Sequence, residues 1–279
     1  MRAIAVDEIT RAVRELFIDA NINLGEDVIA ALRQALTHEE SARGKEVIQE
    51  LLENAGIAKE AAIPVCQDTG LAIVFIELGQ EVHLTGGSLT EAINQGIRQA
   101  TQEDFLRLSA CHCFTRQNTG TNTPAITHVE VVPGEEMRVI VFPKGGGSEN
   151  MSRATVLVPA AGIAGVKAYV VEQIKAAGAD PCPPLIVGVG IGGTFDQAAL
   201  IAKKALLRPV GSKHPDPEIA ALEADFLTGI NDLGIGPMGY GGRITALAVH
   251  VEMIPCHIAS LPVAVNIQCH AHRHKERVI

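Results

Sequence analysis

The segment "CPPLIVGVGIGGTFDQAALIAKKALL" (residues 182–207) decides the fold class. Prolines stiffen its start, an apolar run then predicts a buried strand, and glycines mark a tight turn before apolar residues recur at helical spacing. Outward from this segment, predicted strands and helices alternate through much of the chain. This order favours a mixed α/β (α+β) architecture in which reactive residues lie on loops at the ends of strands.

The remaining elements follow from apolar period and from turn residues. Residues 1–60 read as a helical lead-in with joints at Gly25 and Gly44. We expect a strand at about 71–78, and a helix that begins with a capping box formed by Ser88 and Glu91. "THVEVV" and "MRVIVFP" around "PGEE" predict a β-hairpin, "KGGGSEN" a glycine loop, and "CHAHRHKERVI" a solvated tail.

Composition and charge exclude several classes of protein. The chain has 279 residues, of which 47% are hydrophobic but only 3% aromatic, so Ala, Val, Ile and Leu must build the core. The net charge of −9 disfavours binding to nucleic acid or to an anionic membrane. No apolar run approaches the ~20 residues of a membrane span. The N-terminus has the pattern of an acidic amphipathic helix rather than a signal peptide. We therefore expect a soluble cytoplasmic protein.

The chain has six cysteines, which could form disulfides, bind a metal or simply be buried: Cys66, Cys111, Cys113, Cys182, Cys256 and Cys269. Without a signal sequence a disulfide framework is not expected, and burial is the default role of any single cysteine. Cys66, Cys182 and Cys269 each lie beside a predicted strand. Three thiolates from distant loops are the donor set of a partly open iron–sulfur cluster. Spacing alone does not select this triple from the six.

Two other motifs suggest different chemistry. Gly188, Gly190 and Gly193 form a GxGxxG between a strand and a helix, but the acidic residue expected about twenty positions on is replaced by a loop. A tight turn is the preferred interpretation, and a nucleotide-binding oxidoreductase or binding module is the rival from another class. "CHC" at residues 111–113 lacks the second ligand pair of a zinc site.

Several polar residues stand on predicted loops. Asp68, two residues after Cys66, is a candidate acid or base, or else a turn residue before Thr69 and Gly70. Lys144 and the amides of residues 145–147 could cradle a carboxylate or a phosphate, with a flexible hairpin exit as the alternative. The histidines of the last residues (270, 272 and 274) could chelate a metal, although a solvated tail is the preferred interpretation.

Five motifs in order carry a resemblance to a known family: "VCQDTG", "NTGTNTPA", "KGGGSEN", "CPPLIVGVGIGGT" and "SLPVAVNIQC". Together they resemble the class I, iron–sulfur fumarate hydratases and L-tartrate dehydratases. The resemblance covers nearly the whole chain. It implies a single α-subunit domain over residues 1–279, equivalent to the N-terminal part of the fused enzymes.

The resemblance also implies a set of site residues. It makes Cys66, Cys182 and Cys269 the ligands of a [4Fe-4S] cluster. It makes Asp68 the catalytic acid and His257 the histidine that partners this acid. It places Gln67 in the substrate pocket, Arg107 on a substrate carboxylate and the amide of Gly147 facing the substrate.

The implied reaction is the reversible hydration of fumarate to L-malate, with an open iron as Lewis acid and Asp68 protonating the departing hydroxyl. The base that takes the carbon proton comes from the other half of the enzyme in this family. The resemblance thus implies a β subunit, an α₂β₂ assembly and a small dicarboxylate substrate, with L-tartrate as the alternative to fumarate.

Overall fold

In the computed structural model, which describes residues 2–104 and 106–279, the apolar run after Gly70 becomes the central strand of a four-stranded sheet. The sheet has the order β10-β5-β2-β4, and its strands are β2 (Leu71–Gly79), β4 (Ile126–Val132), β5 (Met137–Lys144) and β10 (Lys275–Val278). Strand β2 runs parallel to β4 and antiparallel to β5. Its buried side chains lie at the centre of this sheet because strands flank it on both sides.

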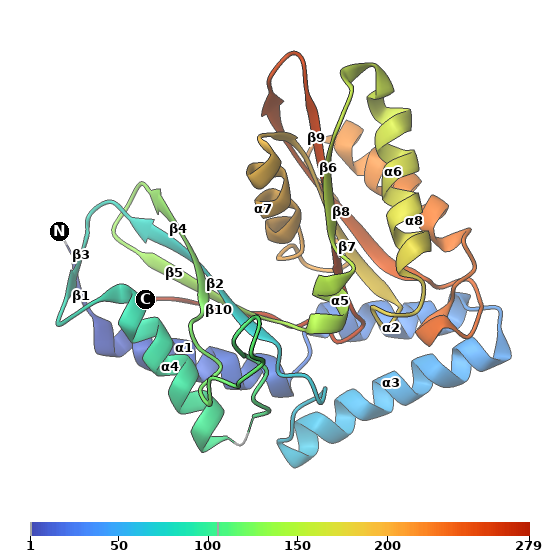
Figure 1. The fold of residues 1–279 in the computed structure, drawn as a ribbon. Helices are drawn as coiled ribbons and strands as arrows, with labels where there is room; N and C mark the ends of the chain where they lie inside the picture. The colour runs from blue at the N-terminus through green and yellow to red at the C-terminus, as the bar shows by residue number, and fades with distance from the viewer. Residues whose placement is uncertain (1, 105) are drawn as a thin grey trace. The chain divides into compact units, whose positions relative to one another are not determined.

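Two amphipathic helices, α1 (Val6–Ile22) and α4 (Leu89–Glu103), pack against each other, and α1 also packs on β5 (Figure 1). Their apolar faces and those of β2 and β5 form one core, in which Phe17 is the largest buried side chain. A short parallel pair, β1 (Arg2–Ala5) and β3 (Val82–Thr85), lies outside this sheet. These elements belong to the first of two compact units, which comprises the chain up to residue 24, residues 55–146 and the chain from residue 273.

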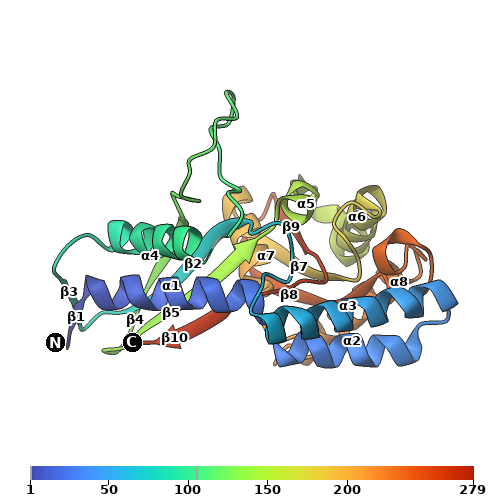
Figure 2. The same ribbon diagram turned by 90° about the horizontal axis from the view of Figure 1, so that it is seen from below.

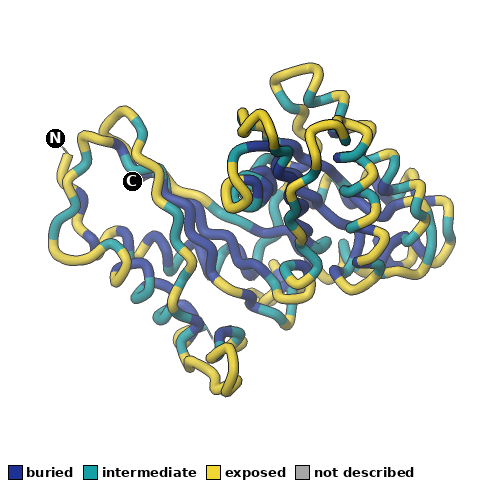
Figure 3. The backbone as a smooth tube through the Cα atoms, turned by 45° about the horizontal axis from the view of Figure 1, so that its top comes forward, coloured by how far each residue is buried: buried dark blue, intermediate teal, exposed yellow. Residues whose placement is uncertain are grey.

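The second unit, residues 25–54 and 147–272, contains a four-stranded sheet of order β6-β9-β7-β8. Its strands are β6 (Arg153–Leu157), β7 (Leu185–Gly193), β8 (Ala246–Cys256) and β9 (Leu261–Gln268). Its longer helices are α2 (Glu26–His38), α6 (Gly162–Ala177), α7 (Phe195–Ala205) and α8 (Pro217–Asn231). Helix α7 packs on one face through small residues, and α6 and α8 cover the other face with a Val- and Ile-rich core. Figure 3 shows buried residues running along the strands of both sheets.

The helical lead-in and the mixed α/β class are confirmed, although α3 (Ala42–Ala61) corrects one joint. Gly25 is the N-cap of α2, as predicted, but Gly44 lies inside α3. The division between the two units falls within α3, after residue 54. No helix in the described part of the chain is long and apolar enough to cross a membrane.

Three local predictions are wrong. The stretches around "PGEE" do not pair as a hairpin, since β2 lies between β4 and β5. Ser88 is the N-cap of α4, but its side chain makes no capping hydrogen bond, and Glu91 pairs instead with Arg98 at 2.6 Å. The end of the chain is not a solvated tail: His272 is buried and the segment after it forms β10.

Gly188 and Gly190 lie inside strand β7 and not in a phosphate-binding turn. A Cβ atom at Gly188 would lie 2.0 Å from the carbonyl oxygen of Ala202, and one at Gly190 would lie 2.1 Å from that of Ala198. The glycines are therefore explained by the close approach of α7 to the sheet. This geometry argues against the dinucleotide-binding hypothesis.

Replacing Gly190 by Ala should destabilise the fold by about 1–3 kcal/mol, because the new methyl group overlaps the backbone of α7. The measurement is urea unfolding followed by circular dichroism. Gly56→Ala is the matched control, since a Cβ at Gly56 meets nothing within 4 Å inside α3. Equal free energies of unfolding for wild type and Gly190→Ala would contradict the packing argument.

His250, on β8, is 1% exposed, and neither ring nitrogen has a hydrogen-bond partner. Burial, and secondarily the positive charge of Arg208, lowers the pKa of His250 to about 4, while Glu223 and Asp27 oppose the shift. The unfolded chain therefore binds a proton at this residue at a higher pH than the folded chain does. Stability contributed by neutral His250 is complete above about pH 6.5 and is lost as the pH falls toward 4.

Between pH 7 and pH 4 the His250 contribution amounts to about 3 kcal/mol. Over the same pH range, the free energy of unfolding of His250→Leu should decrease less than that of the wild type. The difference should equal the His250 contribution. The control is His38→Gln, which replaces an exposed histidine outside the core. If His250→Leu loses stability with acid as steeply as the wild type does, the depressed pKa is not the cause.

Candidate active site

The loop before β2 holds the Asp68 carboxylate with three hydrogen-bond donors. The amide of Gly70 and the hydroxyl of Ser109 donate to Oδ1, at 2.9 and 3.1 Å. The amide of Gly146 donates to Oδ2 at 2.8 Å. The Gly70 contact is the turn expected of an Asp at this position, but the other two come from distant segments. Asp68 is thus more than a local turn residue.

The backbone of this loop is held as well. Arg273, which is 3% exposed, donates through Nη2 to the carbonyl oxygens of Asp68 and Thr69. Gly70 adopts a φ of +77°, and a Cβ there would lie 2.5 Å from the carbonyl oxygen of Lys144. A side chain at Gly70 would therefore separate the loop from the end of β5. Sequence analysis missed Arg273 because its partners are backbone carbonyls more than 200 residues away.

The glycine segment after β5 is a short helix, α5 (Gly146–Asn150), and not a loop. The Gly146 amide donates to the carboxylate of Asp68, so this donor is engaged within the chain and is not the predicted donor to a ligand's carboxylate or phosphate. Lys144 is 2% exposed. Gly147 is exposed and belongs to the second unit, and its predicted contact with substrate stays a prediction.

The loop that carries Arg107 is organised by a buried asparagine. Asn122 lies 1% exposed, accepts hydrogen bonds from the amides of Ser109 and Ala110, and donates to the carbonyl oxygen of Arg107 at 2.9 Å. Arg107 itself is exposed. Figure 2 shows this loop extending from the region after α4. Asn122 lies within "NTGTNTPA", so the motif helps to fix Ser109 and, through it, the donors to Asp68.

Two of the predicted cluster ligands, Cys182 and Cys269, lie next to neighbouring strand ends of the second unit's sheet, before the start of β7 and after the end of β9. Gln268 at the end of β9 pairs with Ile186 near the start of β7, which puts the residues flanking these strands side by side. The amide of His270 donates to the carbonyl oxygen of Cys182 at 3.3 Å. Cys182 adopts a φ of +57°, which is a strained conformation for a residue other than glycine.

The third predicted ligand, Cys66, belongs to the first unit, where its Sγ accepts a hydrogen bond from the amide of Asp68 at 3.4 Å. Amide donors of this kind are typical around the sulfur ligands of iron–sulfur clusters. None of the six cysteines, all of which the structure describes, forms a disulfide. Within residues 2–104 and 106–279, no group of three or more His, Cys, Asp or Glu side chains is gathered for a metal ion. The donor chemistry of the three thiols nevertheless fits the implied cluster, with two of them juxtaposed in one unit.

His257 and Gln67 are each placed on a turn or loop. His257 lies between β8 and β9 and accepts a hydrogen bond from the amide of Ala259 through Nδ1, at 3.1 Å. It belongs to the second unit, so its partnership with Asp68 stays a prediction. The Oε1 of Gln67 lies 3.5 Å from the Sγ of Cys66.

The "CHC" loop has a structural explanation. Cys111 forms an isolated bridge with Asn118, and Nδ1 of His112 accepts hydrogen bonds from the amides of Phe114 and Thr115. His112 therefore stabilises a turn, and the zinc hypothesis gains no support in the described residues.

Comparison with known proteins identifies the family. Residues 10–278 match the sequence model described as Fumarate hydratase (Fumerase). The chain belongs to this family. As a member of the fumarate hydratase family it is a hydro-lyase, and the resemblance stated from the motifs is confirmed.

Curated relatives extend over almost the full chain. The "Putative L(+)-tartrate dehydratase subunit alpha" of Methanocaldococcus jannaschii is 47% identical over 272 residues, which cover 95% of both chains. The "L(+)-tartrate dehydratase subunit alpha" of Escherichia coli K12 is 35% identical over 273 residues, covering 96% of this chain and 90% of the relative. The corresponding protein of E. coli O157:H7 is 36% identical over the same length.

Arg273→Met should lower the free energy of unfolding by about 2 kcal/mol, since it removes charged donors from two buried carbonyl oxygens. Urea unfolding measures the change. Arg277→Met is the matched control four residues later, on β10, because Arg277 forms an exposed pair with Glu15 at 2.6 Å and should matter by less than about 0.5 kcal/mol. Equal losses in the two variants would show that the Asp68 loop does not depend on Arg273.

Proposed function

We propose that the chain is the α subunit of an iron–sulfur-dependent hydro-lyase that hydrates fumarate reversibly to L-malate. The observation that carries the proposal is the Asp68 loop, in which an oriented carboxylate adjoins a cysteine sulfur that accepts an amide hydrogen bond. The match to the fumarate hydratase model over residues 10–278 supports fumarate as the substrate.

The thiolates of Cys66, Cys182 and Cys269 would hold a [4Fe-4S] cluster. Such a cluster, when bound, supplies an open iron that acts as a Lewis acid toward the hydroxyl group of the substrate. The partial exposure of all three thiols is compatible with this role.

The proton transfer by Asp68 is assigned to its Oδ2 atom. Its Oδ1 accepts two hydrogen bonds and its Oδ2 accepts one, so a lone pair remains on Oδ2. In the dehydration direction, protonated Oδ2 gives its proton to the departing hydroxyl group, which leaves as water. In the hydration direction, Oδ2 takes a proton from the water that adds to the double bond.

Four further residues complete the proposed site. Arg107 would bind a carboxylate of the substrate through its guanidinium, and the Gly147 amide and Gln67 would orient the rest of the molecule. His257 would act as the partner of Asp68. The base that removes the carbon proton would come from a β subunit in an α₂β₂ enzyme, and the names of the relatives as alpha subunits support such a partner.

L-tartrate is the second candidate substrate. The names of the relatives from M. jannaschii and E. coli support it. Tartrate differs from malate by one hydroxyl group, so a polar contact to that group would decide between them.

The test uses the chain purified without oxygen together with its β subunit. We expect about four irons and matching sulfide per chain, and kcat/KM for fumarate above that for L-tartrate. Cys182→Ser should lose both iron and activity, whereas Cys256→Ser, which alters an exposed thiol outside the triple, should keep both. Asp68→Asn should retain the cluster and lose about 10²–10⁴ in kcat.

Each failure has its own meaning. A higher kcat/KM for L-tartrate would replace the proposed substrate and leave the chemistry intact. Absence of iron, or activity indifferent to Cys182→Ser, would overturn the cluster mechanism. Full activity of Asp68→Asn would remove Asp68 from the proton transfer.

A further inference from the structure

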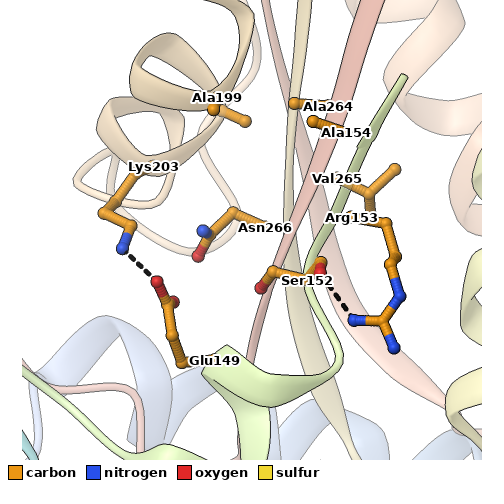
Figure 4. Close-up of a pocket in the computed structure, with 10 residues that line it drawn as sticks. Glu149, Ser152, Arg153, Ala154, Ala199, Lys203, Ala264, Val265 and Asn266 are labelled. Atoms are coloured by element: carbon orange, nitrogen blue, oxygen red, sulfur yellow. Dashed lines mark hydrogen bonds and ion pairs between the residues drawn. The ribbon is translucent and has the colours of Figure 1, made fainter. Parts of the chain in front are cut away.

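Glu39 lies between α2 and α3 in the second unit, is 1% exposed, and has no cation partner among the described residues. Glu149 of the same unit, by contrast, pairs with Lys203 at 2.5 Å (Figure 4). The Glu39 carboxylate instead accepts hydrogen bonds from four backbone amides. Burial raises the pKa of Glu39, but the amides outweigh it and hold the pKa below its usual value, so the group is charged at neutral pH.

The four amides come from two places in the chain. Those of Glu40 and Ser41, just before α3, each donate to Oε1 at 2.8 Å. Those of Arg243 and Ile244, more than 200 residues away, donate to Oε1 at 3.0 Å and to Oε2 at 2.8 Å. Glu39 therefore ties the start of α3 to the loop before β8 through charge-assisted hydrogen bonds.

Two glycines make room for the Glu39 carboxylate. A Cβ atom at Gly44 would lie 2.9 Å from Cδ of Glu39, and one at Gly242 would lie 2.5 Å from its Oε1. Gly242 also has a φ of +130°, which other residues rarely adopt. The glycine inside α3 is thus explained by the close approach of a buried side chain, and Gly242 lies in the loop that Glu39 holds, residues 236–244.

This loop contacts the chain on both sides of Cys182. The amide of Met238 donates to the carbonyl oxygen of Pro183 at 2.8 Å. A Cβ atom at Gly239 would lie 2.3 Å from that of Ala179, so the loop also approaches the turn before Cys182 closely. Cys182 has a φ of +57°, a strained conformation that persists only where its surroundings hold it. The loop supplies such surroundings.

We propose that Glu39 is a positioning residue for iron binding: through the 236–244 loop it keeps Cys182 in the conformation that presents its thiol to the cluster. The inference rests on the proposed function, in which Cys182 is a cluster ligand. In Glu39→Gln an NH₂ group takes the place of one carboxylate oxygen. An NH₂ group cannot accept a hydrogen bond, so a backbone amide of the loop or of the α3 start loses its acceptor, and the loop opens more often.

The test measures the thiol itself, in the full chain freed of iron by chelation. Modification of each cysteine by iodoacetamide is followed by mass spectrometry without denaturant, and circular dichroism checks that each variant is folded. In Glu39→Gln we expect Cys182 to react about tenfold faster than in the wild type, because local opening exposes it. Cys66, which belongs to the first unit, should keep its wild-type rate.

Glu223→Gln is the matched control. Glu223 is also a buried carboxylate of the second unit, 6% exposed, and it accepts hydrogen bonds from the amides of His214 and Val251 rather than from the 236–244 loop. Its replacement should leave the rate at Cys182 unchanged. If Glu39→Gln fails to fold, Gly44→Ala takes its place, because the added methyl group displaces the Glu39 side chain within a helix that favours Ala.

A second measurement uses the chain loaded with its cluster, together with the β subunit. Glu39→Gln should release iron to a chelator about tenfold faster than the wild type, and Glu223→Gln at the wild-type rate. The thiol rates do not depend on iron, so the two proposals fail separately. Absence of iron in the wild type overturns the proposed function. A wild-type rate at Cys182 in Glu39→Gln, unchanged iron release, or equal acceleration at Cys66 or in Glu223→Gln overturns the positioning role.

Discussion

The carboxylate of Asp68 needs hydrogen-bond donors because it is partly buried, and the way in which the chain supplies them organises the first unit. Ser109 comes from the loop after α4, Gly146 follows β5, and Arg273 precedes β10 and holds the backbone of the same loop. Segments that are far apart in the sequence thus converge on one turn. Two of the strands that adjoin these segments, β5 and β10, belong to the same sheet as β2.

The elements that sequence analysis predicted correctly are those fixed by local pattern. Strand β2, helix α7 and the turn between β7 and α7 each follow from the spacing of apolar residues and glycines within a short window. The hairpin around "PGEE" failed because a turn signal says only that the chain reverses. It does not say whether another strand, here β2, enters between the two. The capping-box prediction failed for a similar reason, since the carboxylate of Glu91 pairs with Arg98 and not with a backbone amide.

The same distinction between local pattern and distant contacts applies to the residues of the candidate site. Cys66 and Asp68 were predicted because they share "VCQDTG", one of the motifs that carry the family resemblance. Arg273 and Asn122 could not be predicted, because each binds backbone groups of a distant segment and no side-chain pattern records such a contact. The glycines of β7 show the converse case. Their spacing suggested a nucleotide site, whereas the contact with α7 explains Gly188 and Gly190 by packing alone.

The charges near the Asp68 loop indicate which contacts to the proposed substrate would have to come from other chain segments. A dicarboxylate carries two negative charges, and each needs a cation or several amide donors when it is removed from water. Around the Asp68 loop, Lys144 is buried and Arg273 is engaged by the carbonyl oxygens of Asp68 and Thr69. The Gly146 amide is engaged by Asp68 itself. Arg107 is exposed, and in the proposed function it would bind one carboxylate, so the second would need donors from outside this loop. Among the described residues this loop has an oriented acid but few uncommitted cations beside it, so under the proposed function a partner subunit with basic residues would meet that need.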